Sequence, residues 1–420
     1  MIRDILLSAG IVLAPAGQLS TGLPAGFAEA LLFGFVALSF ARMLWDGRIE
    51  MTDAFIRLGT FWLIFFVTLA LGFCISFFIA RIQILGFVLH DGMAFSLMMA
   101  MCLMMTARRD AAIHMRRSAW LIVGFANVTL ALQVATGWGL LGQPGVGPWL
   151  GDRFQGWSEN PNQLALYCAA YGPLALYLAT TSRSPRAVLL ACAAAILPFY
   201  VGRLTKSDSF LLASVVGYLS FGLLMLGSWL GARVRRPGMP RQLVLLALAG
   251  AVALGASLAP QIAARSPGIE ALAEGMSRGG GGEKTEETAQ LRLYLWKAAA
   301  HTGLSSASLG QGPGPHLERP PVSYRQTLPE LFEAHNTILD LFTQGGLIAV
   351  LNLAWIVTTA VLVAWRARLD ALVALVLSLA VFGLTHLIVR HPVVWFSVAA
   401  CLLAGRPRSV APTTCGRAAP

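Results

Sequence analysis

The sequence predicts an all-α protein that crosses a membrane about twelve times, and two observations carry this prediction. Hydrophobic residues make up 56% of the chain and charged residues only 12%, with a mean hydropathy of +0.68. Soluble domains contain about 25% charged residues, so the composition excludes a soluble protein. Apolar runs close to the length of about 20 residues that a membrane helix needs also recur along the chain.

These apolar runs follow one another with short connections. We expect membrane helices at residues 5–20, 27–45, 59–79, 92–106, 118–138, 163–180, 187–202, 209–231, 242–259, 336–364, 371–388 and 392–404. The chain then divides into an N-terminal transmembrane bundle (1–259), one large loop (260–335), and C-terminal transmembrane helices with a short tail (336–420).

Arginines gather in the short loops on one side of this arrangement. The clusters lie at residues 108–117, 183–186, 233–241, 366–368 and 406–408. The positive-inside rule places them all in the cytoplasm, with both termini there and the large loop on the outer face. They account for much of the formal net charge of +11, so we do not expect a nucleic-acid partner. The six cysteines form no C-x-x-C motif, and neither disulfides nor a zinc site is expected.

The large loop carries a helical pattern and a turn-rich segment. Leu291, Leu295 and Ala298 share one face of a helix predicted over 287–300. Residues 310–315 read G-Q-G-P-G-P, which predicts turns that interrupt regular structure.

His335 and Asn336 end the polar approach to the apolar run that follows the loop. A histidine at the mouth of a membrane helix can accept a proton near neutral pH. The alternative is an interfacial histidine that caps the helix. On a continuous helix His335 and Gly346 would share one stripe, and Gly345 and Gly346 would let a neighbouring helix approach closely.

Several cations also face the outer side. Arg153 precedes Asn160-Pro161-Asn162, where Asn160 is a candidate helix N-cap and Pro161 suits the first helical turn. Arg203 and Lys206 end one apolar run, and the alternative for Lys206 is a structural ion pair with Asp208.

Arg292 lies on the helix predicted in the loop, with Trp296 one turn further on. The tryptophan would seat this helix among lipid headgroups and turn the arginine toward His335. The alternative is a solvated arginine on an amphipathic helix.

A histidine base beside arginines has a definite chemistry. Arginine's planar fork suits bidentate binding of phosphate, and an imidazole can deprotonate an acceptor hydroxyl. The two together fit glycosyl transfer from a lipid diphosphate. The outward loops contain neither a D-x-D motif nor a His/carboxylate pair at metal-ligand spacing, so no metal and no cofactor are expected.

Three patches resemble the O-antigen ligase family, which also includes O-antigen and exopolysaccharide polymerases. Residues 153–165 (R-F-Q-G-W-S-E-N-P-N-Q-L-A) resemble its R…G…NPN…A segment. Residues 292–296 with 310–314 resemble its R…W…GxGPG block, and His335-Asn336 followed by Gly346 resembles the signature H-N-x9-G. Two positions depart from the family pattern: Ala349 replaces Gly, Thr or Tyr, and Ser207-Asp208 stands where the family has Ser-Arg.

The resemblance implies a GT-C-type glycosyltransferase of the bacterial inner membrane, acting at its periplasmic face. It would transfer a glycan from undecaprenyl diphosphate to lipid A–core without a metal. His335 would be the base and Arg292 would bind the diphosphate, with Arg203, Arg153, Lys206, Asn336 and Trp296 as further candidate substrate contacts. Its partners would be the lipid-linked glycan, the acceptor glycan and membrane lipid.

Two other functions fit the same sequence. A polymerase would extend lipid-linked repeat units, so its acceptor would be the growing polysaccharide. A transporter of lipid-linked glycans would perform no reaction, but transporters concentrate ionisable groups near mid-membrane, whereas here they gather at the outer surface.

Overall fold

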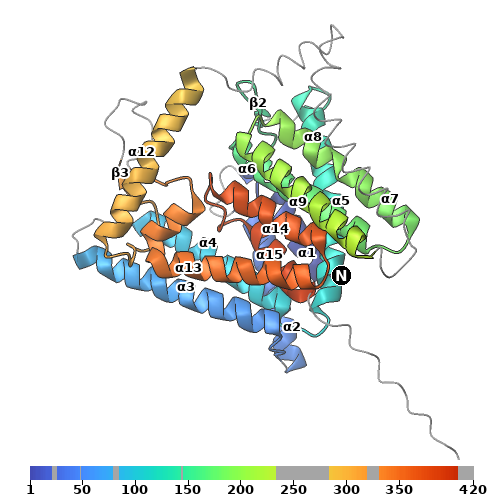
Figure 1. The fold of residues 1–420 in the computed structure, drawn as a ribbon, viewed down its shortest axis with the longest axis horizontal. Helices are drawn as coiled ribbons and strands as arrows, with labels where there is room; N and C mark the ends of the chain where they lie inside the picture. The colour runs from blue at the N-terminus through green and yellow to red at the C-terminus, as the bar shows by residue number, and fades with distance from the viewer. Residues whose placement is uncertain are drawn as a thin grey trace, which may run out of the picture.

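The computed structural model describes residues 1–20, 26–47, 49–78, 85–142, 145–232, 283–318 and 331–404. The helices are α1 (Ile2–Leu13), a 3-10 turn η1 (Gly17–Ser20), α2 (Phe27–Asp46), α3 (Asp53–Phe78), α4 (Leu85–Thr106), α5 (Ala111–Gly137), α6 (Pro161–Thr181), α7 (Pro185–Ala194), α8 (Ile196–Leu204), α9 (Asp208–Ala232), α12 (Glu283–Ser305), α13 (Thr337–Arg366), α14 (Asp370–Gly383) and α15 (Pro392–Ala404). Two short hairpins pair β1 (Trp149–Leu150) with β2 (Arg153–Phe154) and β3 (Leu317–Glu318) with β4 (Leu331–Phe332), both antiparallel. Figure 1 shows the helices gathered into one bundle, with α12 at its edge.

The predicted multi-pass helical membrane protein is confirmed. Within the described residues, eight segments are long and apolar enough to cross a membrane, and α14 and α15 are shorter apolar helices. The span predicted at 242–259 lies outside the described residues. The number of twelve spans and the GT-C architecture therefore stay predictions.

Several predicted boundaries are wrong; α5, for example, begins at Ala111 and not at residue 118. The first helix ends at Leu13 instead of continuing to residue 20, because Pro15 offers no N–H to the helix. The predicted loop 80–91 is already helical from Leu85, and the predicted span 371–388 ends at Gly383.

The predicted span 187–202 is a broken helix, α7 followed by α8. Pro198 cannot donate a hydrogen bond to the carbonyl of Ala194, four residues earlier. The side-chain amide of Asn127 on α5 donates to that carbonyl instead, over 3.0 Å. A neighbouring helix thus satisfies the backbone group that the proline leaves free.

Helix α6 lies at the centre of the bundle, and most of its residues are buried. Helices at the periphery expose large apolar side chains, among them Phe33, Leu63 and Phe77. An apolar outer surface around a well-packed centre is the distribution expected when the surrounding solvent is lipid.

Helix α12 packs on the β3–β4 hairpin through a small apolar cluster of its own. Leu295 and Ala299 of α12 are buried against Leu317 of β3 and Ala334 after β4. The helix predicted at 287–300 is thereby confirmed, with longer bounds. This cluster holds the long helix beside the start of α13 (Figure 1).

Helix α13 is interrupted at Gly346, whose φ of 69° and ψ of −166° are not helical. The backbone N–H groups of Gln311 and Gly312 donate to the carbonyls of Thr343 and Gln344, each over 2.8 Å. A Cβ at Gly346 would lie 2.1 Å from the Ser308 carbonyl oxygen. The close neighbour at Gly346 is thus a loop, whereas at Gly345 it is the expected helix, α3, whose Thr68 Oγ1 would lie 3.0 Å from an added Cβ.

Candidate active site

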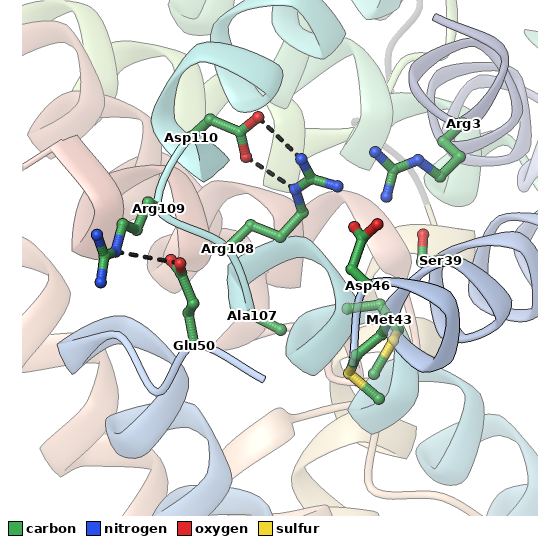
Figure 2. Close-up of a pocket in the computed structure, with 10 residues that line it drawn as sticks. Arg3, Ser39, Met43, Asp46, Glu50, Ala107, Arg108, Arg109 and Asp110 are labelled. Atoms are coloured by element: carbon green, nitrogen blue, oxygen red, sulfur yellow. Dashed lines mark hydrogen bonds and ion pairs between the residues drawn. The ribbon is translucent and has the colours of Figure 1, made fainter. Parts of the chain in front are cut away.

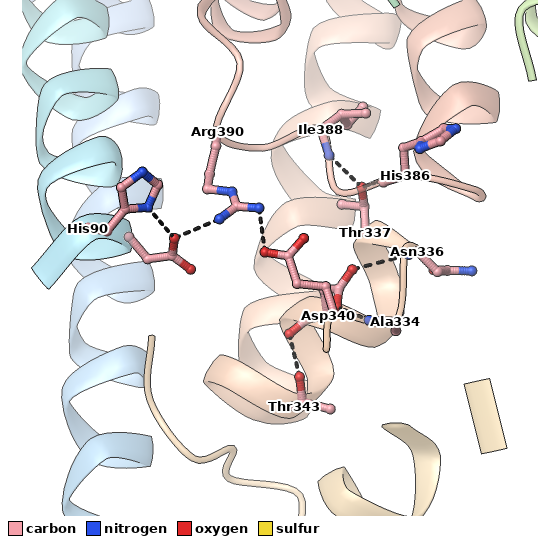
Figure 3. A network of polar contacts seen from close by, with 11 residues as sticks. His90, Ala334, Asn336, Thr337, Asp340, Thr343, His386, Ile388 and Arg390 are labelled. Carbon is pink, nitrogen blue, oxygen red and sulfur yellow. Dashed lines mark hydrogen bonds and ion pairs between the residues drawn. The ribbon is translucent and has the colours of Figure 1, made fainter. Parts of the chain in front are cut away.

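His335 lies in a tight turn between β4 and α13. Its φ is +52°, a left-handed conformation that is uncommon for residues with a side chain. Asp340, in the first turn of α13, binds the backbone of this segment through both carboxylate oxygens. Its Oδ1 accepts a hydrogen bond from the N–H of Ala334 at 2.6 Å, and its Oδ2 accepts one from the N–H of Asn336 at 3.1 Å (Figure 3). The buried carboxylate therefore fixes the backbone on both sides of the histidine.

The helix cap is Asn336 and not His335. Asn336 Oδ1 accepts from the N–H groups of Ile338 and Leu339, and its Nδ2 donates to the Leu384 carbonyl at 2.8 Å. The capping alternative for His335 is therefore wrong, and so is the shared stripe, because the helix begins only at Thr337. His335 keeps a solvent-accessible face although protein atoms surround the rest of its side chain, and no described residue forms a hydrogen bond with its ring.

Trp296 ties α12 to this turn. Its Nε1 donates to the carbonyl of Ala334 over 3.1 Å. Arg292, one turn earlier on α12 and half-buried, is thereby brought within electrostatic range of His335. The two residues are thus neighbours in space, although 42 positions separate them in the sequence.

The imidazole of His335 is poised toward its neutral form. Protein atoms crowd around the ring and lower its pKa below the usual value, which Glu333 opposes and Arg292 and Arg390 reinforce. A neutral imidazole near pH 7 is the form that can take a proton.

A buried ion-pair network, which the sequence analysis did not predict, supports the same turn. Arg390 donates to Glu333 Oε1 at 2.5 Å and to Asp91 Oδ1 at 2.7 Å (Figure 3). Burial disfavours the charge on Arg390, but Glu333 and Asp91 outweigh it and raise its pKa. The position of Arg390 in the sequence could have indicated its role. It lies in a short loop on the predicted outer face, where the other short loops have no arginine clusters.

The loop 384–391 adds two further histidines that the sequence analysis also missed. Burial lowers the pKa of His386 to about 3, with Arg292 and His335 adding to the effect, and burial with Arg390 lowers that of His391 to about 4. The loop is tied to α13 because Thr337 Oγ1 donates to the His386 carbonyl and accepts from the Ile388 N–H (Figure 3). Their sequence signal was one histidine near the end of the apolar run 371–388 and a second just after that run.

Arg153 belongs to the same cluster. Its guanidinium donates to the Thr205 carbonyl at 3.0 Å and to Asn162 Oδ1 at 2.7 Å. Burial lowers its pKa, Asp208 opposes the shift and Arg292 adds to it, so the two arginines lie within electrostatic range of each other. Asn160 caps α6 through the N–H of Asn162, as predicted.

The remaining two cations lie differently. Lys206 has a positive φ of 49° and donates to Asp152 in the β1–β2 turn at 2.7 Å. The alternative of an ion pair with Asp208 is therefore wrong, because the turn at Lys206 aims its side chain at the hairpin. Arg203 is half-buried near the end of α8, and no described contact connects it with His335 or Arg292.

The described residues place the imidazole of His335, whose pKa is lowered, near the guanidinium groups of Arg292 and Arg153, close to the starts of α6, α9 and α13. This imidazole can remove a proton from a hydroxyl while the guanidinium groups stabilise a leaving diphosphate. The fold and this cluster define a multi-pass helical membrane protein with a cationic, histidine-containing site.

Residues 168–354 match the family model described as O-antigen ligase, so the chain carries an O-antigen ligase family domain over this range. The matched range includes Arg292 and the turn of His335, whereas Arg153 and Arg390 lie outside it. No protein in a search of curated sequences matches the chain.

Proposed function

We propose that this protein is a glycosyltransferase that moves a glycan from undecaprenyl diphosphate to an acceptor sugar, lipid A–core, at the periplasmic face of the inner membrane. The observation that supports this proposal best is the convergence of His335 with Arg292 and Arg153, within or beside an O-antigen ligase family domain.

The reaction follows from the roles of these groups. His335 takes the proton of the acceptor hydroxyl as its oxygen attacks the anomeric carbon of the donor glycan. The bond from that carbon to the diphosphate oxygen breaks, and its electron pair leaves with the diphosphate. Arg292 and Arg153 neutralise the growing charge, and attack opposite the leaving group inverts the anomeric centre. None of these steps uses a metal ion.

The direct test replaces the base. His335→Ala should abolish glycan transfer while the protein still inserts and accumulates, because the proposed reaction passes the acceptor proton to this imidazole. The measurement is the polysaccharide ladder on a gel, together with the amount of protein in the membrane. His301→Ala is the matched control, since His301 is an exposed histidine on α12.

An unchanged ladder in His335→Ala would refute the base and would favour a transporter of lipid-linked glycans. Deletion of the gene separates ligase from polymerase. Lipid A–core without O-chain, with long lipid-linked polymer accumulating, indicates a ligase. Single repeat units on the acceptor indicate a polymerase, which would use the same residues on a different acceptor.

A further inference from the structure

A cavity of about 230 Å³ lies at the end of the bundle where α1 begins and α2 and α4 end (Figure 2). Helix α4 carries Asp91, which Arg390 links to Glu333 beside His335, and reaches this cavity at Met104. At about 1.5 Å of rise per residue, the two points are roughly 20 Å apart along the helix. The cavity is therefore separate from the candidate active site and has no part in the proposed reaction.

The cavity is lined by three arginines and three carboxylates, which are unequally paired. Arg108 donates twice to Asp110, at 2.8 and 3.0 Å, and Arg109 pairs with Glu50 at 3.1 Å. Arg3 forms no side-chain ion pair among the described residues; Arg108 is close enough to repel it, and Asp4 and Asp110 are close enough to attract it. Figure 2 shows the guanidinium groups of Arg3 and Arg108 turned into the same space with the Asp46 carboxylate beside them, so a ligand there meets charges of both signs.

Two buried polar atoms of the lining lack a partner among the described residues. Ser39 Oγ belongs to a side chain that is only 5% exposed, and Glu50 Oε2 is buried although its other oxygen meets Arg109. A buried polar group left without a hydrogen bond costs about 1–3 kcal/mol. A ligand that accepts from the hydroxyl and donates to the carboxylate would satisfy both atoms.

Several residues that neighbour the cavity lining in sequence are apolar and exposed. Trp45, next to the cavity residue Asp46, is 91% exposed, and Leu44 and Met1 are 65% and 86% exposed. An exposed tryptophan at the end of a membrane-length helix is typical of the headgroup layer. The cavity therefore opens toward lipid headgroups, and a lipid is a better occupant than a soluble ion.

We propose that this cavity binds the headgroup of an amino-phospholipid, with the phosphate between Arg3 and Ser39 and the ammonium group at Glu50. Guanidinium and hydroxyl groups donate to phosphate, and the orphan carboxylate oxygen accepts from the ammonium group. The equal numbers of arginines and carboxylates in the lining match a zwitterion and not a purely anionic headgroup.

The test measures lipid binding by the purified full chain with native mass spectrometry. Phosphatidylethanolamine, phosphatidylglycerol and inorganic phosphate are each titrated onto delipidated protein. We expect one tightly held phosphatidylethanolamine, at least tenfold weaker phosphatidylglycerol, and no displacement of the lipid by equimolar phosphate.

Variants locate the site. Arg3→Ala should weaken phosphatidylethanolamine binding at least tenfold, and Ser39→Ala, which preserves the fold best, about threefold. Arg117→Ala is the control, because Arg117 is an exposed arginine of α5 outside the cavity. Each variant is first shown to be monodisperse.

Three results would overturn the proposal. Equal binding of the two lipids would remove the ammonium contact, and displacement by phosphate would identify a soluble ligand instead. Unchanged lipid retention in Arg3→Ala and Ser39→Ala together would show that the lipid sits elsewhere.

Discussion

The residue that organises the candidate site is Asp340, which touches no substrate in the proposed reaction. Its two oxygens accept from the N–H groups of Ala334 and Asn336 and so hold His335 at a positive φ between them. Nothing in the linear pattern distinguishes this aspartate from a first-turn acid that merely favours the helix dipole. Its role depends on the turn at His335, which brings the N–H groups of Ala334 and Asn336 within hydrogen-bonding distance of Asp340.

Asp340→Asn should therefore lower kcat about tenfold and leave KM nearly unchanged. The amide offers one acceptor and places an NH₂ group against the second N–H, which leaves a buried donor unsatisfied at a cost of about 1–3 kcal/mol.

Steady-state transfer rates in nanodiscs measure these effects. The control is Asp370→Asn, since Asp370 is a buried carboxylate that opens α14 and contacts Ser228. A normal kcat for Asp340→Asn would remove its positioning role, and an equal loss for Asp370→Asn would reduce the effect to general destabilisation.

A second prediction concerns Glu333 and the pH dependence of the transfer rate. The rate should fall as pH drops through the pKa of His335, because the protonated imidazole cannot accept a proton. Glu333 raises that pKa, whereas Arg292 and Arg390 lower it. Glu333→Gln removes the raising influence and frees Arg390, so the acidic limb of the rate profile should shift to lower pH.

Initial transfer rates between pH 4.5 and 8 would show the shift. Glu318→Gln, at an exposed position of the adjacent strand β3, serves as the matched control. An acidic limb that stays in place, or moves to higher pH, would mean that His335 does not set it.

At this scale the sequence predicts which candidate residues lie near one another better than it predicts their individual contacts. His335, Arg292 and Arg153 were selected because of their residue types and positions, and the structure places them near one another. The Lys206–Asp152 pair and the Arg390 network were not predictable, because their partners come from segments 54 and 57 or more residues apart. Pairing over such distances is decided by packing, which hydropathy does not report.

At the scale of elements, the break in α13 explains the spacing H-N-x9-G. Asn336 starts the helix, and Gly346 ends its first part at the point where the loop 308–312 adds its own hydrogen bonds. The glycine-rich segment of that loop docks beside Gly72 of α3 as well, where a Cβ would lie 2.6 Å from the Gly312 nitrogen. Three segments therefore meet with their backbones in contact.

Gly346→Ala should be strongly destabilising. Alanine would have to adopt a φ of 69° and ψ of −166°, a region that is essentially reserved for glycine, and its Cβ would overlap the Ser308 carbonyl. We expect a loss of at least about 3 kcal/mol, which would strongly reduce the amount of folded protein in the membrane.

Gly124→Ala is the matched control in α5, because a Cβ there meets nothing within 4 Å. It should be neutral or slightly stabilising, since alanine has the higher helix propensity. Thermal unfolding in detergent compares the two. Equal midpoints for Gly346→Ala and Gly124→Ala would show that the break in α13 does not require glycine.

At the scale of the whole molecule, hydropathy predicted which segments are helical and failed where packing ends a helix. Residues 384–391 read L-T-H-L-I-V-R-H and are apolar enough to look like a continuation of the preceding helix. They leave the helix because Thr337 and Asn336 bind their carbonyls and because Arg390 reaches Asp91. This loop covers the start of α13 and so joins the last two helices to the candidate site.

The same loop predicts acid sensitivity of the whole fold. His386 and His391 have folded-state pKa values of about 3 and about 4, whereas an unfolded histidine titrates near 6.5. Between those values the unfolded chain binds protons that the folded chain does not. The contribution of these two histidines to stability is therefore constant above about pH 6.5 and falls below it, by up to roughly 1.4 kcal/mol per pH unit for each histidine.

The unfolding midpoint in nanodiscs should consequently drop by on the order of 5 °C between pH 7 and pH 5. His391→Gln should reduce this drop, because one of the two imidazoles that the fold keeps neutral is gone, whereas His301→Gln on the exposed face of α12 should leave it unchanged. If His391→Gln and His301→Gln lost stability in parallel with the wild type as the pH fell, the carboxylates elsewhere in the chain, and not this loop, would govern the response to acid.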